Sequence, residues 1–283
     1  MVFVHYPTGG FGHYISKVLT VCVDGVDKPS WIASELDRPV GENNHNFPLL
    51  AKKFINKSDD VFEEFKHFPI QSWDPTSAKT DNLVILIDCG YKYSDSSFIK
   101  NAYPEAKIIK MYVDDQSISI LAERILKWMV PEEKRNDYRN LYGFYSEWIL
   151  NNSFTDFDFE PQDFCINIPI GSLFFNVDQF VDIIDTQVGS LDRVSFDKIH
   201  DQFETANNYL RRIPDLEKQL FRCVESNSVF DFGECSNAEY GFLLVRLEQM
   251  LKRSIPNLPA HRFASTVELN NHLKKFKINL DNK

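Results

Sequence analysis

The feature that most constrains this chain is a glycine-rich turn directly after its first apolar run. The short run at residues 2–5 predicts a strand, and the turn that follows consists of Pro7, Thr8, Gly9, Gly10, Phe11, Gly12 and His13. Beyond the turn, apolar residues recur at helical spacing, at Ile15, Val18, Leu19 and Cys22. The segment therefore predicts a strand, a tight turn and a helix, as at the start of an α/β fold.

A turn of this kind is suited to binding an anion. Glycines between a strand and a helix let backbone N–H groups close on phosphate or sulfate, and the helix N-terminus adds partial positive charge. The segment is neither the Gly-x-Gly-x-x-Gly fingerprint of dinucleotide-binding proteins nor the Gly-Lys-Ser/Thr turn of Walker nucleotidases. Two interpretations remain open: an anion site at residues 7–13, or simply a tight connection between strand and helix.

Further apolar runs predict the rest of a sheet, at residues 83–87, 108–113 and 164–168. A short helical stretch at residues 96–103 separates the first two runs, so together they form a strand–helix–strand unit. After the last run the pattern is helical. We therefore expect an α/β fold with a mostly parallel central sheet, helices on both faces and a C-terminal helical layer.

The helical segments suggest how the chain is divided. Asp114 is a natural N-cap for an amphipathic helix that follows it, and another helix is expected over residues 132–150. We expect an α/β domain over residues 1–210 and a helical C-terminal extension over residues 211–283, packed on the same domain.

Composition narrows the possible functions. Forty-one acidic against thirty-one basic residues give a net charge of −10, which repels nucleic-acid backbones, so no nucleic-acid partner is expected. Five scattered cysteines without a Cys-x-x-Cys pair predict neither a disulfide framework nor a metal site. With no signal-like start and no run of eighteen uncharged apolar residues, we expect a cytoplasmic protein without a membrane partner.

Three segments resemble sulfotransferases, a family with a P-loop-like fold. In that family a strand leads into Pro-Lys-x-Gly-Thr-Thr and a helix, and Pro7 and Gly10 match this motif. Residues 98–113, with Pro-x-Ala-Lys before an apolar strand, are similar to the segment before the family's 3′-phosphate site. Residues 168–174 resemble the strand and loop after its sheet. The resemblance covers residues 1–210 and implies a P-loop-like three-layer sandwich.

The resemblance implies transfer of a sulfuryl group from 3′-phosphoadenosine 5′-phosphosulfate, or another nucleotide, to a hydroxyl or amine of a small-molecule or glycan acceptor. Thr8 stands at the family's donor-binding lysine, and Asp114 and Asp115 stand where it has a phosphate-binding arginine. Arg124, with Ser117 or a neighbouring serine, is the candidate replacement, and a salt-bridged or solvated arginine is the alternative. Because the usual charged contacts are missing, we expect weak or undetectable binding and transfer with the ordinary donor.

The resemblance also implies a general base, for which the sequence offers several candidates. By position the base is Asp88 or Cys89, with a structural cap as the alternative role for Asp88. His67 is a second candidate base, and His13 is placed to donate a hydrogen bond to a bound anion, unless these histidines are packed or solvent-facing. A second hypothesis is a non-catalytic fold relative that binds a phosphorylated ligand or a protein partner. The sequence predicts no oligomeric state.

Overall fold

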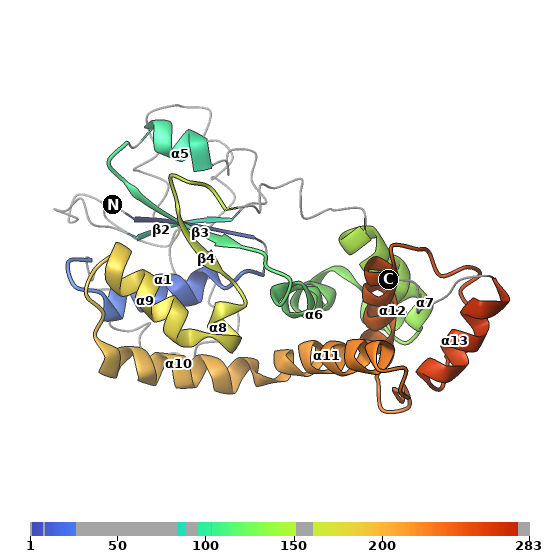
Figure 1. Ribbon diagram of the computed structural model, residues 1–283. Helices are drawn as coiled ribbons and strands as arrows, with labels where there is room; N and C mark the ends of the chain where they lie inside the picture. The colour runs from blue at the N-terminus through green and yellow to red at the C-terminus, as the bar shows by residue number, and fades with distance from the viewer. Residues whose placement is uncertain are drawn as a thin grey trace. The chain divides into compact units, whose positions relative to one another are not determined.

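The structure is a computed structural model that describes residues 2–7, 9–26, 84–88, 96–102, 104–150 and 161–276 (Figure 1). The chain forms two compact units. Unit 1 consists of Met1–Ser117 and Phe157–Tyr209, and unit 2 consists of Ile118–Asp156 and Leu210–Lys283. The C-terminal helices therefore share a unit with residues 118–156, which the sequence-based division places in the α/β domain.

Unit 1 contains a four-stranded sheet in the order β2-β1-β3-β4, and every neighbouring pair is parallel. The strands are β1 (Val2–Tyr6), β2 (Val84–Asp88), β3 (Lys107–Tyr112) and β4 (Ile166–Pro169). In the centre, Val4 pairs with Leu86 on one side and with Ile109 on the other. The apolar runs therefore form one parallel sheet, which confirms the predicted α/β class.

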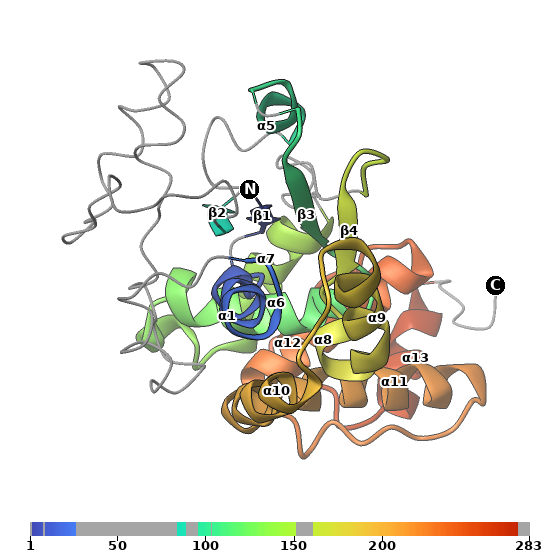
Figure 2. The same ribbon diagram turned by 90° about the vertical axis from the view of Figure 1, so that its left-hand side faces the viewer.

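The helices of unit 1 are α1 (Gly12–Cys22), α5 (Ser96–Ala102), α8 (Ser172–Phe175), α9 (Val177–Gln187) and α10 (Arg193–Asn207), which continues as a 3₁₀ turn, η6 (Asn208–Arg211). Figures 1 and 2 show α5 on one face of the sheet and α1, α9 and α10 on the other. Right-handed crossovers would place helices on opposite faces, because the strand order runs from β1 to β2 on one side and then to β3 on the other side of β1.

Aromatic side chains fill the space among α1, α8, α9 and α10. Phe203 of α10 is central: its ring stacks on Tyr14 at 4.1 Å between centroids and meets Phe11 edge-on at 5.3 Å. Further described rings of this aromatic cluster are those of Phe174, Phe175, Phe180, Phe196 and His200. Burial of such large side chains supplies much of the packing energy that fixes these helices on the sheet.

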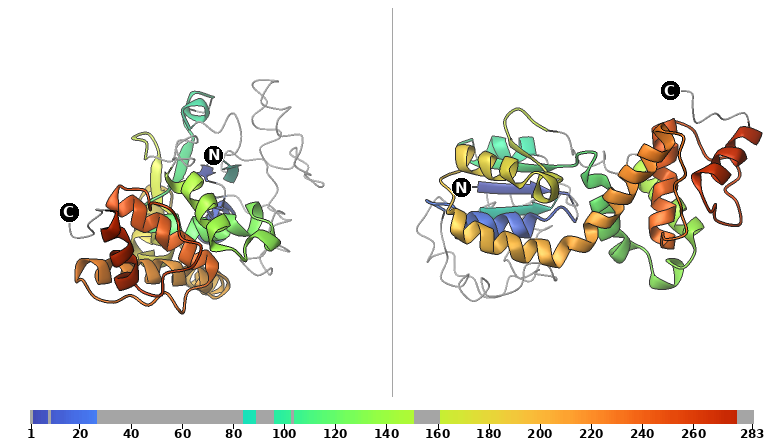
Figure 3. Two further views of the ribbon diagram at one scale, coloured as in Figure 1. Left: turned by 90° about the vertical axis from the view of Figure 1, so that its right-hand side faces the viewer. Right: turned by 60° about the horizontal axis from the view of Figure 1, so that its bottom comes forward.

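Unit 2 is helical in the part that the structure describes. Its elements are α6 (Ser117–Met129, beginning at the last residue of unit 1), η3 (Glu132–Lys134), α7 (Tyr138–Tyr145), η4 (Ser146–Leu150, a π-helix), α11 (Arg212–Glu225), α12 (Asn237–Leu251) and α13 (Thr266–Lys275). Helix α12 packs closely on α7 (Figure 3). A Cβ atom at Gly241 would lie 3.0 Å from the Tyr138 carbonyl oxygen, so glycine permits this approach.

The single helix expected over residues 132–150 is wrong. A 3₁₀ turn ends at Lys134, and α7 begins only at Tyr138. The reason is Asp137, whose carboxylate accepts a 2.9 Å hydrogen bond from the Arg139 amide and so caps α7 in extended backbone geometry. The helical pattern in the sequence is real, but a cap residue divides it.

Candidate functional site

The order of the strands identifies where unit 1 would bind a ligand. From β1 the chain crosses to β2, and from β2 it crosses back to β3 on the other side of β1. The direction of winding therefore reverses between β1 and β3, and open α/β sheets bind ligands at the carboxyl ends of the strands at this switch point. The glycine-rich turn follows the carboxyl end of β1, and Tyr112 with Asp114 stands at that of β3.

The backbone of the turn has the alternating conformation of an anion-binding nest. Gly9 has φ = 81° and Phe11 has φ = 64°, whereas Gly10 between them is not in the positive-φ region. Successive residues that alternate between left-handed and right-handed backbone conformations direct their N–H groups toward one point, as in phosphate-binding loops. A bulky residue such as Phe11 costs about 1–2 kcal/mol in the left-handed region, so the surrounding structure must hold it there.

Two contacts show what holds the turn. A Cβ atom at Gly10 would lie 2.7 Å from the Pro7 ring, and one at Gly12 would lie 2.2 Å from the Tyr6 ring, so both positions require glycine. The Phe11 ring lies edge-on to Phe174 at 5.2 Å between centroids, which anchors the turn to α8. The conformation is therefore fixed by packing around the turn.

The described residues of the turn, 7 and 9–12, are buried, so their amide groups need acceptors. The Gly10 amide donates a 2.7 Å hydrogen bond to the Pro7 carbonyl, so this amide is not available to an anion. Among the described residues, no backbone carbonyl accepts a hydrogen bond from the amides of Gly12 and Tyr14. They are the donors that this geometry offers to an anion at the start of α1.

Helix α1 is fixed to α10 by a buried hydrogen bond close to the turn. The Tyr14 hydroxyl lies 2.8 Å from Nδ1 of His200, and Nε2 of His200 lies 3.6 Å from the Glu204 carboxylate. Burial raises the pKa of Tyr14 well above its ordinary value, with smaller contributions from the charges of Cys22 and Glu204. Tyr14 is therefore neutral at physiological pH, and its hydrogen bond with His200 positions the first turn of α1.

At the end of β3, Asp114 has a structural role that the sequence does not reveal. Its carboxylate accepts a 2.9 Å hydrogen bond from the Gly171 amide after β4, and its backbone N–H donates to the Ser117 hydroxyl. Asp114 is thus not the N-cap of α6, which begins at Ser117. A Cβ atom at Gly171 would lie 2.5 Å from the carboxylate, so the two residues fit closely.

This arrangement also decides what Ser117 can do. Its hydroxyl donates a 2.9 Å hydrogen bond to the Asp114 carbonyl and accepts one from the Asp114 amide. The hydroxyl proton is therefore already used within the β3–α6 turn, and Ser117 does not donate to a phosphate in this arrangement. Arg124 lies on the same helix, α6, about two turns beyond Ser117, and belongs to unit 2, whereas the glycine-rich turn belongs to unit 1.

The remaining candidates are placed only in part. Asp88 ends β2 and pairs with Tyr6 at the carboxyl edge, and His13 lies in the first turn of α1. The side chains of both, together with Thr8, His67 and Cys89, lie outside the described residues.

Sequence reasoning missed two buried basic residues, His5 in β1 and Lys110 in β3. The signal was present, because a basic residue inside an apolar strand run is unusual in a sheet covered on both faces.

Comparison with protein-family models, with curated proteins and with solved structures gives no match for this chain. Among the described residues there is no cluster of three or more side chains that would hold a metal ion. In the same part of the chain, no helix combines the length and the apolar character needed to cross a bilayer.

Proposed function

We propose that this chain binds an anionic ligand, a phosphate or sulfate group, at the turn that joins β1 to α1. The observation that carries the proposal is the alternation of positive φ at Gly9 and Phe11 in a buried turn. Such a strained backbone is retained where the surrounding structure over-determines it, typically at a binding site. The amides of Gly12 and Tyr14 supply the donors, and the α1 dipole favours negative charge at the same point.

A second candidate function is sulfuryl transfer, and it rests on the resemblance to sulfotransferases and a P-loop-like sandwich. The segment that led to this candidate, residues 98–113, forms part of α5 and all of β3, next to β1. In this function the amides at the start of α1 stabilise charge on the transferred group, and Asp88 at the carboxyl end of β2 deprotonates the acceptor. The donor is a nucleotide phosphosulfate and the acceptor a hydroxyl or amine.

The residues at the β3 edge favour anion binding over transfer from the ordinary donor. Asp114 stands where the resembling family has an arginine, and its carboxylate is held by the Gly171 amide. The Asp114 side chain therefore adds no positive charge at this point. Loss of a charge-assisted contact weakens binding by about 1.5–3 kcal/mol. We therefore expect this chain to bind 3′-phosphoadenosine 5′-phosphosulfate more weakly than a protein with an arginine at this position.

The proposal is tested by thermal unfolding with sulfate, phosphate, adenosine 3′,5′-bisphosphate, ATP and GTP. A ligand that binds only the folded chain raises its stability by about 2.7 kcal/mol at one hundred times the dissociation constant. Two variants are matched, Gly9→Ala and Gly25→Ala, because Gly9 has φ = 81° and Gly25 has φ = 78°. Both replacements carry a similar backbone cost, but only Gly9 belongs to the turn.

The expected result is a stabilising response to at least one phosphate- or sulfate-bearing ligand in the unaltered chain and in Gly25→Ala. Gly9→Ala should lose most of that response, because alanine disfavours the positive φ of Gly9 and the amide groups of the turn would no longer point at one anion. An equal response in both variants would exclude the turn as the site.

A further inference from the structure

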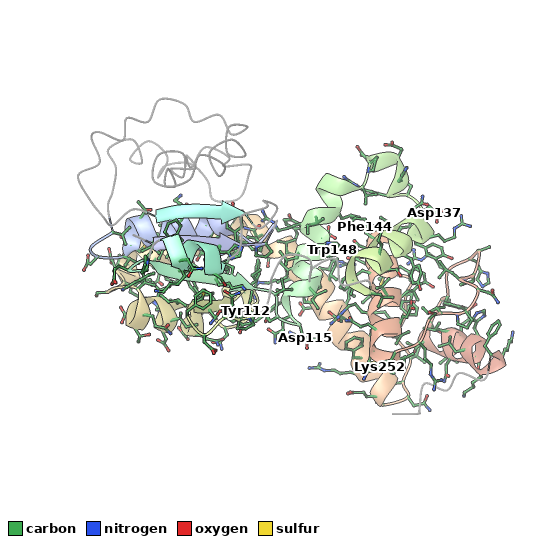
Figure 4. All side chains as sticks on the ribbon, turned by 90° about the horizontal axis from the view of Figure 1, so that it is seen from above. Tyr112, Asp115, Asp137, Phe144, Trp148 and Lys252 are labelled. Carbon is green, nitrogen blue, oxygen red and sulfur yellow. The ribbon has the colours of Figure 1, made fainter. Side chains whose placement is uncertain are left out.

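Two side chains at the carboxyl end of β3 stand beside the glycine-rich turn. The parallel register of β1 and β3 pairs His5 with Lys110. Extended by two residues, the same register places Tyr112 level with Pro7, where the turn begins. Neighbouring strands lie about 4.8 Å apart, so Tyr112 and the turn share one point of the sheet edge. Tyr112 and Asp115 both lie at this end of unit 1 (Figure 4).

The segment that leads into α8 links Asp114 to the same turn. The Gly171 amide, directly before α8, donates a 2.9 Å hydrogen bond to the Asp114 carboxylate. Within α8, the ring of Phe174 meets that of Phe11 in the turn at 5.2 Å between centroids. Gly171 and Phe174 are less than one helical turn apart. Because one short segment contacts both the turn and Asp114, a small ligand can reach both.

The side chains of Asp114 and Tyr112 together suit a cation. Oδ1 of Asp114 accepts from the neutral Gly171 amide, and among the described residues no basic side chain forms an ion pair with this carboxylate. Burial, followed by the Asp114 charge, raises the pKa of the half-buried Tyr112, so its phenol is neutral at physiological pH and close to that carboxylate. An ammonium group is attracted both by a carboxylate and by the face of an aromatic ring.

We propose that the ligand of the turn is a phosphate or sulfate ester that also carries an ammonium group, which binds to Asp114 and Tyr112. This inference rests on the proposed function, because the anionic group lies at the start of α1 in both. A ligand with negative charge alone is repelled by the Asp114 carboxylate, whereas a zwitterion is attracted by the turn and the carboxylate together. The exposed Asp115 adds to the negative potential at this edge.

The test compares 2-aminoethyl phosphate with ethyl phosphate, which lacks the ammonium group. Binding to the full chain is measured by isothermal titration calorimetry at constant ionic strength. Asp114→Asn removes the charge and keeps an oxygen acceptor for the Gly171 amide. Asp115→Asn is the matched control, because it removes the same charge from the exposed neighbouring residue. Tyr112→Leu removes the aromatic ring and keeps an apolar side chain at the half-buried position.

The unaltered chain should bind 2-aminoethyl phosphate about 10- to 100-fold more tightly than ethyl phosphate, as expected for one charged hydrogen bond. Asp114→Asn should lose most of this preference, and Tyr112→Leu should reduce it about 2- to 5-fold, as expected for loss of a cation–π contact. Asp115→Asn should keep the preference. All three variants should still bind ethyl phosphate, because the turn itself is unchanged.

The outcomes separate this inference from the proposed function. Equal binding of the two phosphates by the unaltered chain would overturn the inference and still support anion binding by the turn. A preference that persists unchanged in both Asp114→Asn and Tyr112→Leu would overturn it as well, because the ammonium group would then bind elsewhere. Binding of neither phosphate would contradict the turn as an anion site, and this inference with it.

Discussion

The carboxylate of Asp114, at the end of β3, accepts a 2.9 Å hydrogen bond from the backbone amide of Gly171, after β4. The two residues are 57 positions apart in sequence, and their contact closes the carboxyl edge of the sheet next to the switch point. Stability of that edge therefore depends on an acidic side chain.

Replacing Asp114 should destabilise unit 1 without creating a phosphate contact. Asp114→Ala leaves the Gly171 amide without its acceptor and should cost about 1–3 kcal/mol in the free energy of unfolding. Asp114→Asn keeps an oxygen acceptor and should cost less, and Asp114→Arg should be the least stable of the three. Urea unfolding measures these differences, with Asp115→Ala as the control, since Asp115 is exposed (Figure 4). A stable Asp114→Arg variant with stronger phosphate binding would contradict this role.

Glycine substitutions should separate a required glycine from a dispensable one. At Gly12 a Cβ atom would lie 2.2 Å from the Tyr6 ring, so Gly12→Ala should cost about 1–3 kcal/mol through overpacking. At Gly143 of α7 a Cβ atom would meet nothing within 4 Å, so Gly143→Ala should gain about 0.5–1 kcal/mol of helix stability. Opposite shifts in the melting temperature are expected. Equal shifts would mean that the turn has room for a side chain.

The Tyr14–His200 contact should appear as a pH-dependent contribution to stability. Tyr14→Phe removes the buried hydrogen bond to Nδ1 of His200 and should cost about 1–3 kcal/mol near neutral pH. Burial raises the folded-state pKa of Tyr14, so its contribution is complete below the ordinary tyrosine pKa of about 10 and declines as pH rises above it. Denaturant unfolding of the variant and the unaltered chain should therefore converge at high pH. A cost that grows above pH 10 would contradict this assignment.

Cys235 should react slowly with iodoacetamide. Burial, followed by the Glu239 charge, raises its pKa to about 11, so little thiolate is present at neutral pH. Cys223 is half-buried and serves as the internal reference. Mass spectrometry after timed alkylation should find Cys223 modified well before Cys235, and the difference should narrow as pH approaches 11. Equal rates at neutral pH would show that Cys235 is not shielded.

The sheet could be predicted from the sequence because its strands are continuous apolar runs, and β1, buried at every described position, is the clearest case. The turn could be predicted because glycines must stand where Pro7 and Tyr6 leave no room for a side chain. Both are local signals, which a sequence carries directly.

What could not be predicted depends on contacts between distant segments. Asp114 has the local pattern of a helix cap, and only the Gly171 amide reveals its different role. The second unit joins residues 118–156 to residues 210–283, and the local sequence of neither segment indicates that it packs with the other. In the same way, Gly241 is explained only by the approach of α12 to the Tyr138 carbonyl.

The most direct test of the central claim is a backbone amide NMR titration of the full chain with sodium sulfate at constant ionic strength. The account predicts saturable shifts that are largest for the amides of Gly12, His13 and Tyr14, because the first N–H groups of α1 point at the anion. The amide chemical shifts of Gly25 and Gly143 should not change. Saturable shifts confined to other residues, or no saturable shift at the start of α1, would contradict anion binding by this turn.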